Sequence, residues 1–450
     1  MKYIFRNYGM VFVLIALCAL FSILTLKEQV PDSSSAVTHL AQQINDGFGK
    51  EDLILTVGAF NKDSAPLAEL LKEKLARDGF DNVQTIVGIP RDLQLALDGL
   101  QAQNRTPAVI ATSGEVTKWR VIELLADKYP TFSDCKIVEP KSFLWPDFLK
   151  RSNLLAIVDR IVVIAVLAIG MTMVIITGGI DLSVGSLIAV SAVIATAIMK
   201  ALGGLNAPDW VVWVGFIGGI LASGIIGGLG GLIVAWFKVP SFITTLGIML
   251  MGRGLAFMIT GGFSIYQVPK ALPWLGQGAS FGIPNTVVLL IVLYIAAHIF
   301  MSHTRLGRHI YAVGGNEEAA RLSGVSVRYV IVFVFFVCGL TAGLGGCIQA
   351  SQLNTGTPNM GIMYELFVIA AVVVGGTSLA GGTGKILGTL IGVFVISVIQ
   401  NGMNLLGIES YTQQVVLGLV ILIAVLLDKV RSSGAFRNAF LNNKTIPAES

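Results

Sequence analysis

The sequence predicts a polytopic α-helical membrane protein, with about ten transmembrane helices and an inserted α/β domain of the doubly wound type. The first observation behind this is composition. The 450 residues are 54% hydrophobic and 13% charged, whereas a soluble domain carries roughly 25% charged residues. The second is charge distribution, because 15 basic and 18 acidic residues, more than half of the charged residues, lie between Lys27 and Arg151. The third is a series of long apolar runs outside that stretch.

Ten apolar runs approach the length that crosses a bilayer. About 20 mostly apolar residues are needed, because roughly 30 Å of hydrocarbon is crossed at about 1.5 Å per residue. The first run follows Lys2 and Arg6, as a cleavable signal peptide would, but its 19 apolar residues exceed a signal core and favour an uncleaved anchor. The runs cover residues 8–26, 155–177, 183–201, 210–236, 241–260, 285–302, 328–350, 365–381, 385–402 and 411–428.

The basic residues between these runs predict the orientation. With the N-terminus in the cytoplasm, the short outer loops keep Lys200 and Lys270, while the inner side collects the other loop cations, as the positive-inside bias requires. We therefore expect an integral protein of the cytoplasmic (inner) membrane, with both termini in the cytoplasm and the charged insert extracytoplasmic. The expected inner cations are Lys238, Arg305, Arg308, Arg321, Arg328, Lys385, Lys429 and Arg431.

Four parts follow from these patterns. Residues 1–27 are an N-terminal transmembrane anchor helix, and 28–142 are the extracytoplasmic α/β insert. Residues 143–430 form the main membrane domain, and 431–450 are a cytoplasmic tail.

Several kinds of chemistry are excluded. The net charge of +4 comes without a basic stripe interleaved with aromatic residues, so nucleic acid is not expected as a partner. The four cysteines and four histidines show no metal-ligand spacing, so we expect no metal and no cofactor. The chain also lacks a phosphate-binding loop, because Ile386 follows Gly384-Lys385 and Leu379 stands where the first glycine is required. We therefore expect no catalytic residue and no ATP hydrolysis by this chain.

The insert alternates short apolar strands with helical stretches. Strands are expected at 53–57, 83–89, 108–112 and 136–139, with helices starting near Ser64, Arg91 and Glu115. The strands start about 25–30 residues apart, which is the spacing of βαβ units and predicts a parallel doubly wound sheet.

This pattern resembles one lobe of a periplasmic sugar-binding protein. Such sheets bind ligands beyond the carboxyl ends of their strands. A clamp needs two such lobes, so three roles stay open: a docking surface for a soluble binding protein, a fused low-affinity sugar receptor, or a spacer. The candidate ligand-face residues are Phe60, Asn61, Arg91, Ser113 and Trp119.

Glycine pairs and membrane acids mark the main domain. Residues 178–185 and 375–382 share the pattern GGxxLxxG after an apolar run, which indicates either chance or the glycine-broken helices of a duplicated transporter. Asp181 and Ser183 either cap a helix start or face the pathway. Glu365 is a functional candidate if it lies inside the membrane. Arg253 is expected to pair with backbone carbonyls or with a carboxylate.

A short capped helix is predicted between the sixth and seventh runs. Asn316 is a good N-cap, Glu317 and Glu318 occupy the first turn, Arg321 the last, and Gly324 can close the helix. From spacing alone it is either a solvated connecting helix or a rigid lever for a soluble partner.

Four segments carry a resemblance. The runs GMTMVIITGGIDLSVGSLIA (170–189), VPSFITTLGIMLMGRGLAFMITGG (239–262), AVGGNEEAARLSGV (312–325) and IAAVVVGGTSLAGGTGKILGTLIGV (369–393) together resemble the permease subunits of ribose-type ABC sugar importers. The resemblance covers residues 8–26 and roughly 143–430, which makes the latter the permease domain.

The resemblance implies both partners and site residues. Two permease subunits, here a homodimer in membrane lipid, would enclose the pathway. Two cytoplasmic ABC ATPase subunits would drive it, and a periplasmic solute-binding protein would deliver a small-molecule sugar. Coupling to the ATPase would fall to Asn316, Glu317, Glu318, Arg321 and Gly324, and the pathway candidates are Gly179, Asp181, Ser183, Gln352 and Glu365.

Two positions depart from the family pattern. Gln352 stands where family members carry a basic residue, and Phe367 where they carry an acidic one. An ion pair or a sugar contact is therefore expected to be lost, and the solute need not be ribose. Two alternatives stay open: a membrane-anchored ligand sensor that uses the insert, and a secondary transporter.

Overall fold

The computed structural model describes residues 2–29, 33–60, 64–280 and 282–432. The chain forms two compact units: residues 1–25 together with 148–450, and residues 26–147. The first is called the membrane unit below and the second the insert unit, and each is described by itself.

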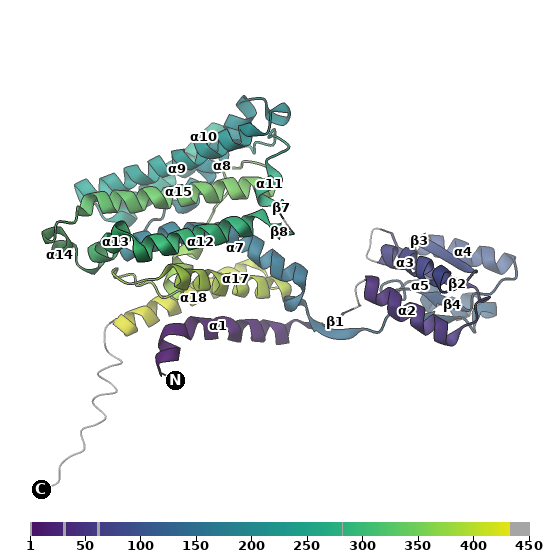
Figure 1. Ribbon diagram of the computed structural model, residues 1–450. Helices are drawn as coiled ribbons and strands as arrows, with labels where there is room; N and C mark the ends of the chain where they lie inside the picture. The colour runs from purple at the N-terminus through teal and green to yellow at the C-terminus, as the bar shows by residue number, and fades with distance from the viewer. Residues whose placement is uncertain (1, 30–32, 61–63, 281, 433–450) are drawn as a thin grey trace, which may run out of the picture. The chain divides into compact units, whose positions relative to one another are not determined.

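The membrane unit is a bundle of helices (Figure 1). Among the described residues, seven helices are long and apolar enough to cross a membrane, and three apolar helical stretches are shorter, so the protein is a polytopic helical membrane protein. Each of the ten predicted runs falls on one of these helices. The seven are α7 (Arg151–Ile176), α8 (Val184–Ala201), α9 (Trp210–Phe237), α10 (Ser241–Thr260), α12 (Asn285–His303), α15 (Val327–Leu353) and α17 (Ile386–Leu405); the shorter stretches lie in α1 (Lys2–Leu24), α16 (Tyr364–Val374) and α18 (Ser410–Ser432).

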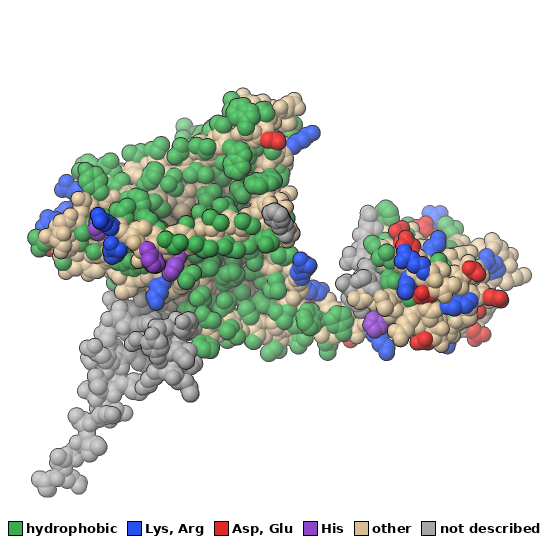
Figure 2. Space-filling model, in the orientation of Figure 1, with side chains coloured by type: hydrophobic (Ala, Val, Ile, Leu, Met, Phe, Trp, Pro, Cys, Tyr) green, Lys and Arg blue, Asp and Glu red, His purple; other side chains and the backbone are tan. Residues whose placement is uncertain are grey.

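Short elements join these helices at both ends of the bundle. At one end lie α13 (Arg305–Gly315) and α14 (Glu317–Leu322), where basic and histidine side chains gather in Figure 2. The other end carries α11 (Pro273–Gly276) and the hairpin of β7 (Ala279–Ser280) and β8 (Ile283–Pro284). The remaining short helices are η2 (Asp147–Leu149) and η3 (Gly204–Asn206).

Small residues let the central helices touch backbone to backbone. α9 and α15 lie side by side (Figure 1), and a Cβ added to Gly227 would lie 3.0 Å from the Cα of Gly339. A Cβ on Gly343 would lie 2.8 Å from the Cα of Ile220. These glycines therefore serve close helix packing, as small residues do in membranes.

One predicted run is shorter as a helix than as an apolar run. Residues 365–381 are apolar, but α16 ends at Val374 because Gly376 adopts a left-handed conformation with φ of +92°. The residues from Gly375 to Lys385 form no regular element.

The insert unit is built on a parallel sheet. Its strands are β2 (Ile54–Ala59), β3 (Val83–Gly88), β4 (Val109–Ala111) and β5 (Lys136–Val138), in the order β3-β2-β4-β5. Helices α2 (Ser33–Gly47) and α3 (Ser64–Arg77) share one apolar core with the sheet. Helices α4 (Pro90–Ala102), α5 (Arg120–Glu123) and α6 (Leu125–Lys128), followed by η1 (Pro130–Phe132), share a second core.

The insert differs from its prediction in three places. Helix α2 was not expected. The helix predicted near Glu115 is a turn followed by the one-turn helices α5 and α6. The unit is also longer than residues 28–142, because β1 (Leu26–Gln29) pairs antiparallel with β6 (Phe143–Pro146).

Two neighbouring leucines of α3 test the insert core. Leu71 is fully buried, whereas Leu70 is 43% exposed. Leu71→Ala should lower the free energy of unfolding of the insert by about 2–5 kcal/mol, and Leu70→Ala should lower it far less. In the full-length protein, limited proteolysis should cleave the insert of Leu71→Ala about 30-fold faster or more. Equal cleavage rates for the two variants would contradict this core.

Candidate functional site

Helices α7 and α16 end in the same way. After α7, the Gly178 N–H donates to the Ile175 carbonyl and the Gly179 N–H to the Val174 carbonyl, at 2.9 and 3.0 Å. After α16, the Gly376 and Thr377 N–H groups make the equivalent two bonds, and φ of Gly376, like that of Gly178, is positive. Both are Schellman caps, which need a residue that tolerates a left-handed conformation. Both helices therefore end in the same way at the GGxxLxxG pattern, but one residue out of register, because the left-handed glycine is the first of the pair in one and the second in the other.

The non-helical residues between α7 and α8 are held by hydroxyl groups of α10. The Ile180 N–H donates to Ser241 Oγ and the Leu182 N–H to Thr245 Oγ1, each at 3.0 Å. Backbone groups at membrane depth must find partners inside the protein. The segments 170–189 and 239–262, which resemble permeases, therefore meet here. The first contains the break in the helix, and the second supplies the hydroxyl oxygens that accept its hydrogen bonds.

Asp181 and Ser183 lie together in this break. Asp181 is fully buried, and its Oδ1 accepts hydrogen bonds from the Ser183 N–H at 2.9 Å and the Ser183 hydroxyl at 2.6 Å. The thiol of Cys338 on α15 also neighbours this carboxylate. The carboxylate closes a local turn before α8, and it does not reach the surface of the chain.

Glu365 approaches the same helix start from α16. Its carboxylate lies against Gly185 in the first turn of α8, and it is half-buried. A carboxylate is stabilised at a helix N-terminus by the helix dipole. Arg253 of α10 interacts with Glu365 electrostatically and donates hydrogen bonds to the carbonyls of Pro358 and Met360, each at 2.7 Å. The predicted pairing of Arg253 with backbone carbonyls is confirmed.

Three glycine segments meet where α7 ends. The Gly382 N–H, from the loop before α17, donates to the Ile176 carbonyl at 2.9 Å. Gly314 of α13 packs against both groups, and an added Cβ there would lie 2.7 Å from the Gly382 nitrogen. The Tyr311 hydroxyl donates to the Gly384 carbonyl at 2.9 Å. We call these five residues the glycine junction.

Helix α14 follows the glycine junction directly. Asn316 separates it from α13, and its Oδ1 accepts the Ala319 N–H at 2.9 Å. Glu318 and Arg321 form an ion pair at 2.6 Å with both side chains about two-thirds exposed, and Gly324 closes the helix with φ of +83°. The predicted capped helix is confirmed, with Glu317 exposed in its first turn.

The other pathway candidates are placed differently. Gly179 packs against Val174 and Phe335 in the first break. Gln352, near the far end of α15, donates from Nε2 to the Asp159 carbonyl of α7 at 3.1 Å. The structure therefore gathers Gly179, Asp181, Ser183 and Glu365 around the start of α8, and Gln352 holds a separate helix contact.

The candidate ligand-face residues of the insert differ in their burial. Phe60 and Arg91 are exposed, and Trp119 is half-buried against the core formed with α4 to α6. The Ser113 hydroxyl is buried without a hydrogen bond to the described residues. Asn61 lies outside the described residues.

The glycine junction was not predicted as a site. Gly384 was considered only for phosphate binding, and Gly314, Gly382 and Tyr311 were not candidates. A signal was present, because Gly-Gly pairs stand at or just after a helix end at 178–179, 314–315 and 375–376, and a further pair at 381–382 stands in the loop before α17. Which pairs touch depends on the packing of α7, α13 and α17.

The long apolar helices of the described residues define the chain as a polytopic helical membrane protein. Residues 153–425 match the family described as branched-chain amino acid transport system / permease component. Because this match covers more than half of the chain, the protein belongs to that family.

Curated relatives are similar over the same region. The ribose import permease protein RbsC of Escherichia coli K12 is 44% identical over 292 residues, which cover 64% of this chain and 88% of the relative. The D-allose transport system permease protein AlsC of the same strain is 34% identical over 311 residues, or 69% and 94% of the two chains. The L-arabinose ABC transporter permease protein AraH of Azospirillum brasilense is 35% identical over 286 residues, or 64% and 82%. No solved structure matches the chain.

Two adjacent glycines test the glycine junction. A Cβ on Gly314 would overlap the Ile176 carbonyl, whereas a Cβ on Gly315 would meet nothing within 4 Å. Gly314→Ala should destabilise the detergent-purified protein by about 1–3 kcal/mol, the usual cost of overpacking, and Gly315→Ala should leave its melting temperature almost unchanged. Equal melting temperatures for the two variants would argue against the close approach at Gly314.

Proposed function

We propose that the chain is the membrane-spanning subunit of an ATP-driven importer that carries a monosaccharide or similar small polar solute inward. Two copies would enclose the pathway, two ABC ATPase subunits would bind on the cytoplasmic side, and a periplasmic solute-binding protein would deliver the solute. Three sugars named in the relatives, ribose, allose and arabinose, support this solute class.

The observation that carries the proposal is the connection of α14 to the glycine junction. Asn316 is the residue between Gly315, the last residue of α13, and α14. A push on α14 reaches Gly314, which packs against the end of α7 and the loop before α17 at once. A movement of the capped helix α14 would therefore be passed to α7 and to α17 together. Its exposed face, with Glu317 and Glu318, is the surface offered to an ATPase, and Asn316, Arg321 and Gly324 maintain its shape.

The pathway would pass the start of α8. The residues around it, Gly179, Asp181, Ser183 and Glu365, combine broken backbone with buried or half-buried carboxylates, a combination typical of solute pathways in transporters. Because Asp181 is fully buried in the single chain, its role would be to hold the break, while Glu365 would face the solute. Gln352 would act indirectly, through its bond to α7.

The topology has ten spans, counting α1, α16 and α18 with the seven longer helices. Both termini lie in the cytoplasm and the insert lies outside, which puts α13 and α14, with their basic side chains, on the cytoplasmic side. Among the roles open to the insert, we favour docking of the binding protein, because Phe60 and Arg91 are exposed at the surface whereas Trp119 is half-buried against the core.

The coupling role of α14 is tested by charge reversal. Because an exposed pair such as Glu318–Arg321 contributes about 0–1 kcal/mol, Glu317→Lys with Glu318→Lys should leave α14 folded. Uptake of labelled ribose, allose or arabinose, whichever the unmodified protein carries, should fall about tenfold or more in cells with the complete transporter. The amount of protein in the membrane should not change.

The matched control is Glu409→Lys, an exposed carboxylate that follows the opposite end of α17 from the junction, and its uptake should stay normal. Normal uptake in the double variant would refute the coupling role. Uptake by vesicles that contain this chain and no ATPase would instead establish a secondary transporter.

A further inference from the structure

The two strands that begin and end the insert unit expose apolar side chains on both faces. We call the pair β1–β6 the neck ribbon; its register pairs Leu26 with Pro146 and Lys27 with Trp145. Successive residues of a strand point to opposite faces, so Leu144 points away from Phe143 and Trp145. The exposed fractions are 48% for Leu26, 46% for Phe143, 68% for Leu144 and 46% for Trp145. The same two faces carry the polar residues of β1: Glu28 lies opposite Leu144, Lys27 opposite Trp145 and Gln29 opposite Phe143.

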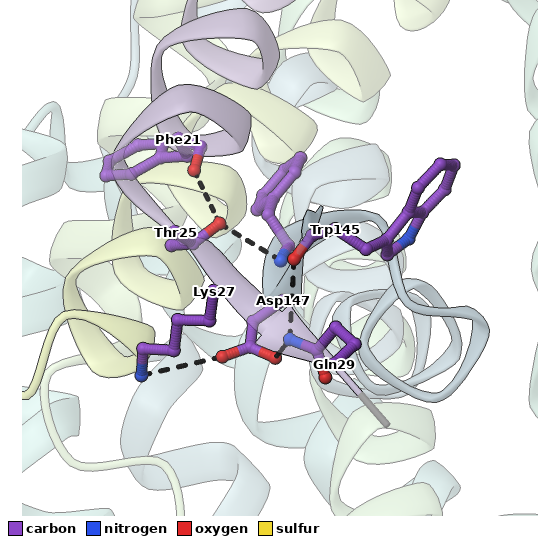
Figure 3. Close-up of polar contacts among 7 residues, drawn as sticks. Phe21, Thr25, Lys27, Gln29, Trp145 and Asp147 are labelled. Carbon is purple, nitrogen blue, oxygen red and sulfur yellow. Dashed lines mark hydrogen bonds and ion pairs between the residues drawn. The ribbon is translucent and has the colours of Figure 1, made fainter. Parts of the chain in front are cut away.

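Lys27, Gln29 and Asp147 pair with one another at the neck ribbon (Figure 3), while Glu28 is exposed opposite Leu144. Lys27 Nζ lies 3.5 Å from Asp147 Oδ2. Gln29 Nε2 donates to Asp147 Oδ1 at 2.9 Å and to the Trp145 carbonyl at 3.3 Å. These contacts hold the strands together and leave the aromatic and aliphatic side chains to face the surroundings.

Within the membrane unit, the residues that precede and follow the insert are clamped together. Thr25 Oγ1 donates to the Phe21 carbonyl at 2.6 Å and accepts the Phe148 N–H at 3.1 Å. The rings of Phe21 and Phe148 stack with centroids 6.2 Å apart. Because Leu26 follows Thr25 and Asp147 precedes Phe148, both strands of the neck ribbon must start from this clamp. At about 3.3 Å per residue, Leu26 and Lys27 stay within about 7 Å of it.

The length of α1 indicates how deep in the membrane the clamp of Thr25 and Phe148 lies. The apolar run within α1 covers residues 8–24, or about 26 Å of helix at about 1.5 Å per residue. The hydrocarbon layer is roughly 30 Å thick, and the interfacial layer beyond it adds about 5–8 Å on each side. A span slightly shorter than the hydrocarbon layer is accommodated by thinning of the bilayer or by flanking residues that lie at the interface. The first two residue pairs of the neck ribbon flank α1 at this end, and they include Leu26 and Trp145.

We propose that the neck ribbon is a lipid anchor, whose Leu26, Phe143, Leu144 and Trp145 side chains lie in the interfacial layer of the outer leaflet. Lipid is the occupant because the clamp holds the ribbon at the end of a short span and because Trp, with a Lys beside it, is the residue pair that favours this layer. The neck ribbon would thereby fix the level at which the insert leaves the membrane. The inference rests on α1 being a span, which is part of the proposed function.

Spin-label accessibility in the full-length protein in lipid nanodiscs tests the proposal. The four native cysteines are replaced by alanine, and a label is placed by Leu144→Cys. Two reference labels are Ile15→Cys on α1, where the native side chain is 58% exposed, and Leu95→Cys on α4 of the insert, where it is 59% exposed. Collisions with oxygen report lipid, and collisions with a water-soluble nickel chelate report water.

The expected oxygen-to-nickel ratio at Leu144→Cys is about fivefold or more above that at Leu95→Cys and below that at Ile15→Cys. Adding Phe143→Ser and Trp145→Ser should bring it close to the Leu95→Cys value, while the mobility of the Leu95→Cys label stays unchanged because the insert core is intact. A Leu144→Cys ratio equal to that of Leu95→Cys in the starting protein would place the ribbon in water and overturn the proposal.

Two other outcomes also contradict it, and they are distinguishable. An immobilised Leu144→Cys label that neither reagent reaches would mean that a protein, such as a second copy or the binding protein, covers the ribbon. Loss of the lipid signal at Ile15→Cys would mean that α1 is not a span, so the topology in the proposed function would fail as well.

Discussion

The hydrogen bond from the Gly382 N–H to the Ile176 carbonyl is the contact on which the membrane unit depends most. A carbonyl at the last turn of a helix has no partner within the helix, and leaving one unpaired in lipid costs several kcal/mol. The donor comes from the loop before α17, and Gly314 of α13 covers the bond closely enough that a side chain there would collide with it. Three parts of the chain are thus fixed to one another by close backbone contacts and by the hydrogen bond from the Tyr311 hydroxyl to the Gly384 carbonyl.

The same need for backbone partners explains the rest of the site. Hydroxyls of Ser241 and Thr245 take the N–H groups of the first break, and Asp181 takes the next one. At the neck of the insert, Thr25 takes the Phe148 N–H. In each place, irregular backbone is held by a short polar side chain or by a glycine contact, and the segments that supply these groups are those that resemble permeases.

Local patterns were predicted from the sequence more fully than long-range contacts. The insert strands start within one residue of the predicted positions, and Asn316 and Gly324 close α14 as expected, because strand alternation and capping are properties of neighbouring residues. Helix α2 was missed because its sequence from Ser33 to Gly47 has few strongly apolar residues. The neck ribbon and the glycine junction were missed because they join residues more than 60 positions apart in the sequence. Trp119 looked like a ligand-face residue, but it packs against the core of the insert.

Native-state hydrogen exchange of the full-length protein in lipid nanodiscs tests most directly whether the glycine junction makes one unit of its three segments. The free energies of opening for residues 177–183, 312–316 and 378–385 are measured from their amide exchange rates. If the segments open together, their free energies should agree within about 0.5 kcal/mol, as expected for one cooperative unit. If residues 312–316 open independently, at a free energy well below that of the other two segments, the three segments do not form one unit. A movement of α14 would then not be passed to α7 and α17.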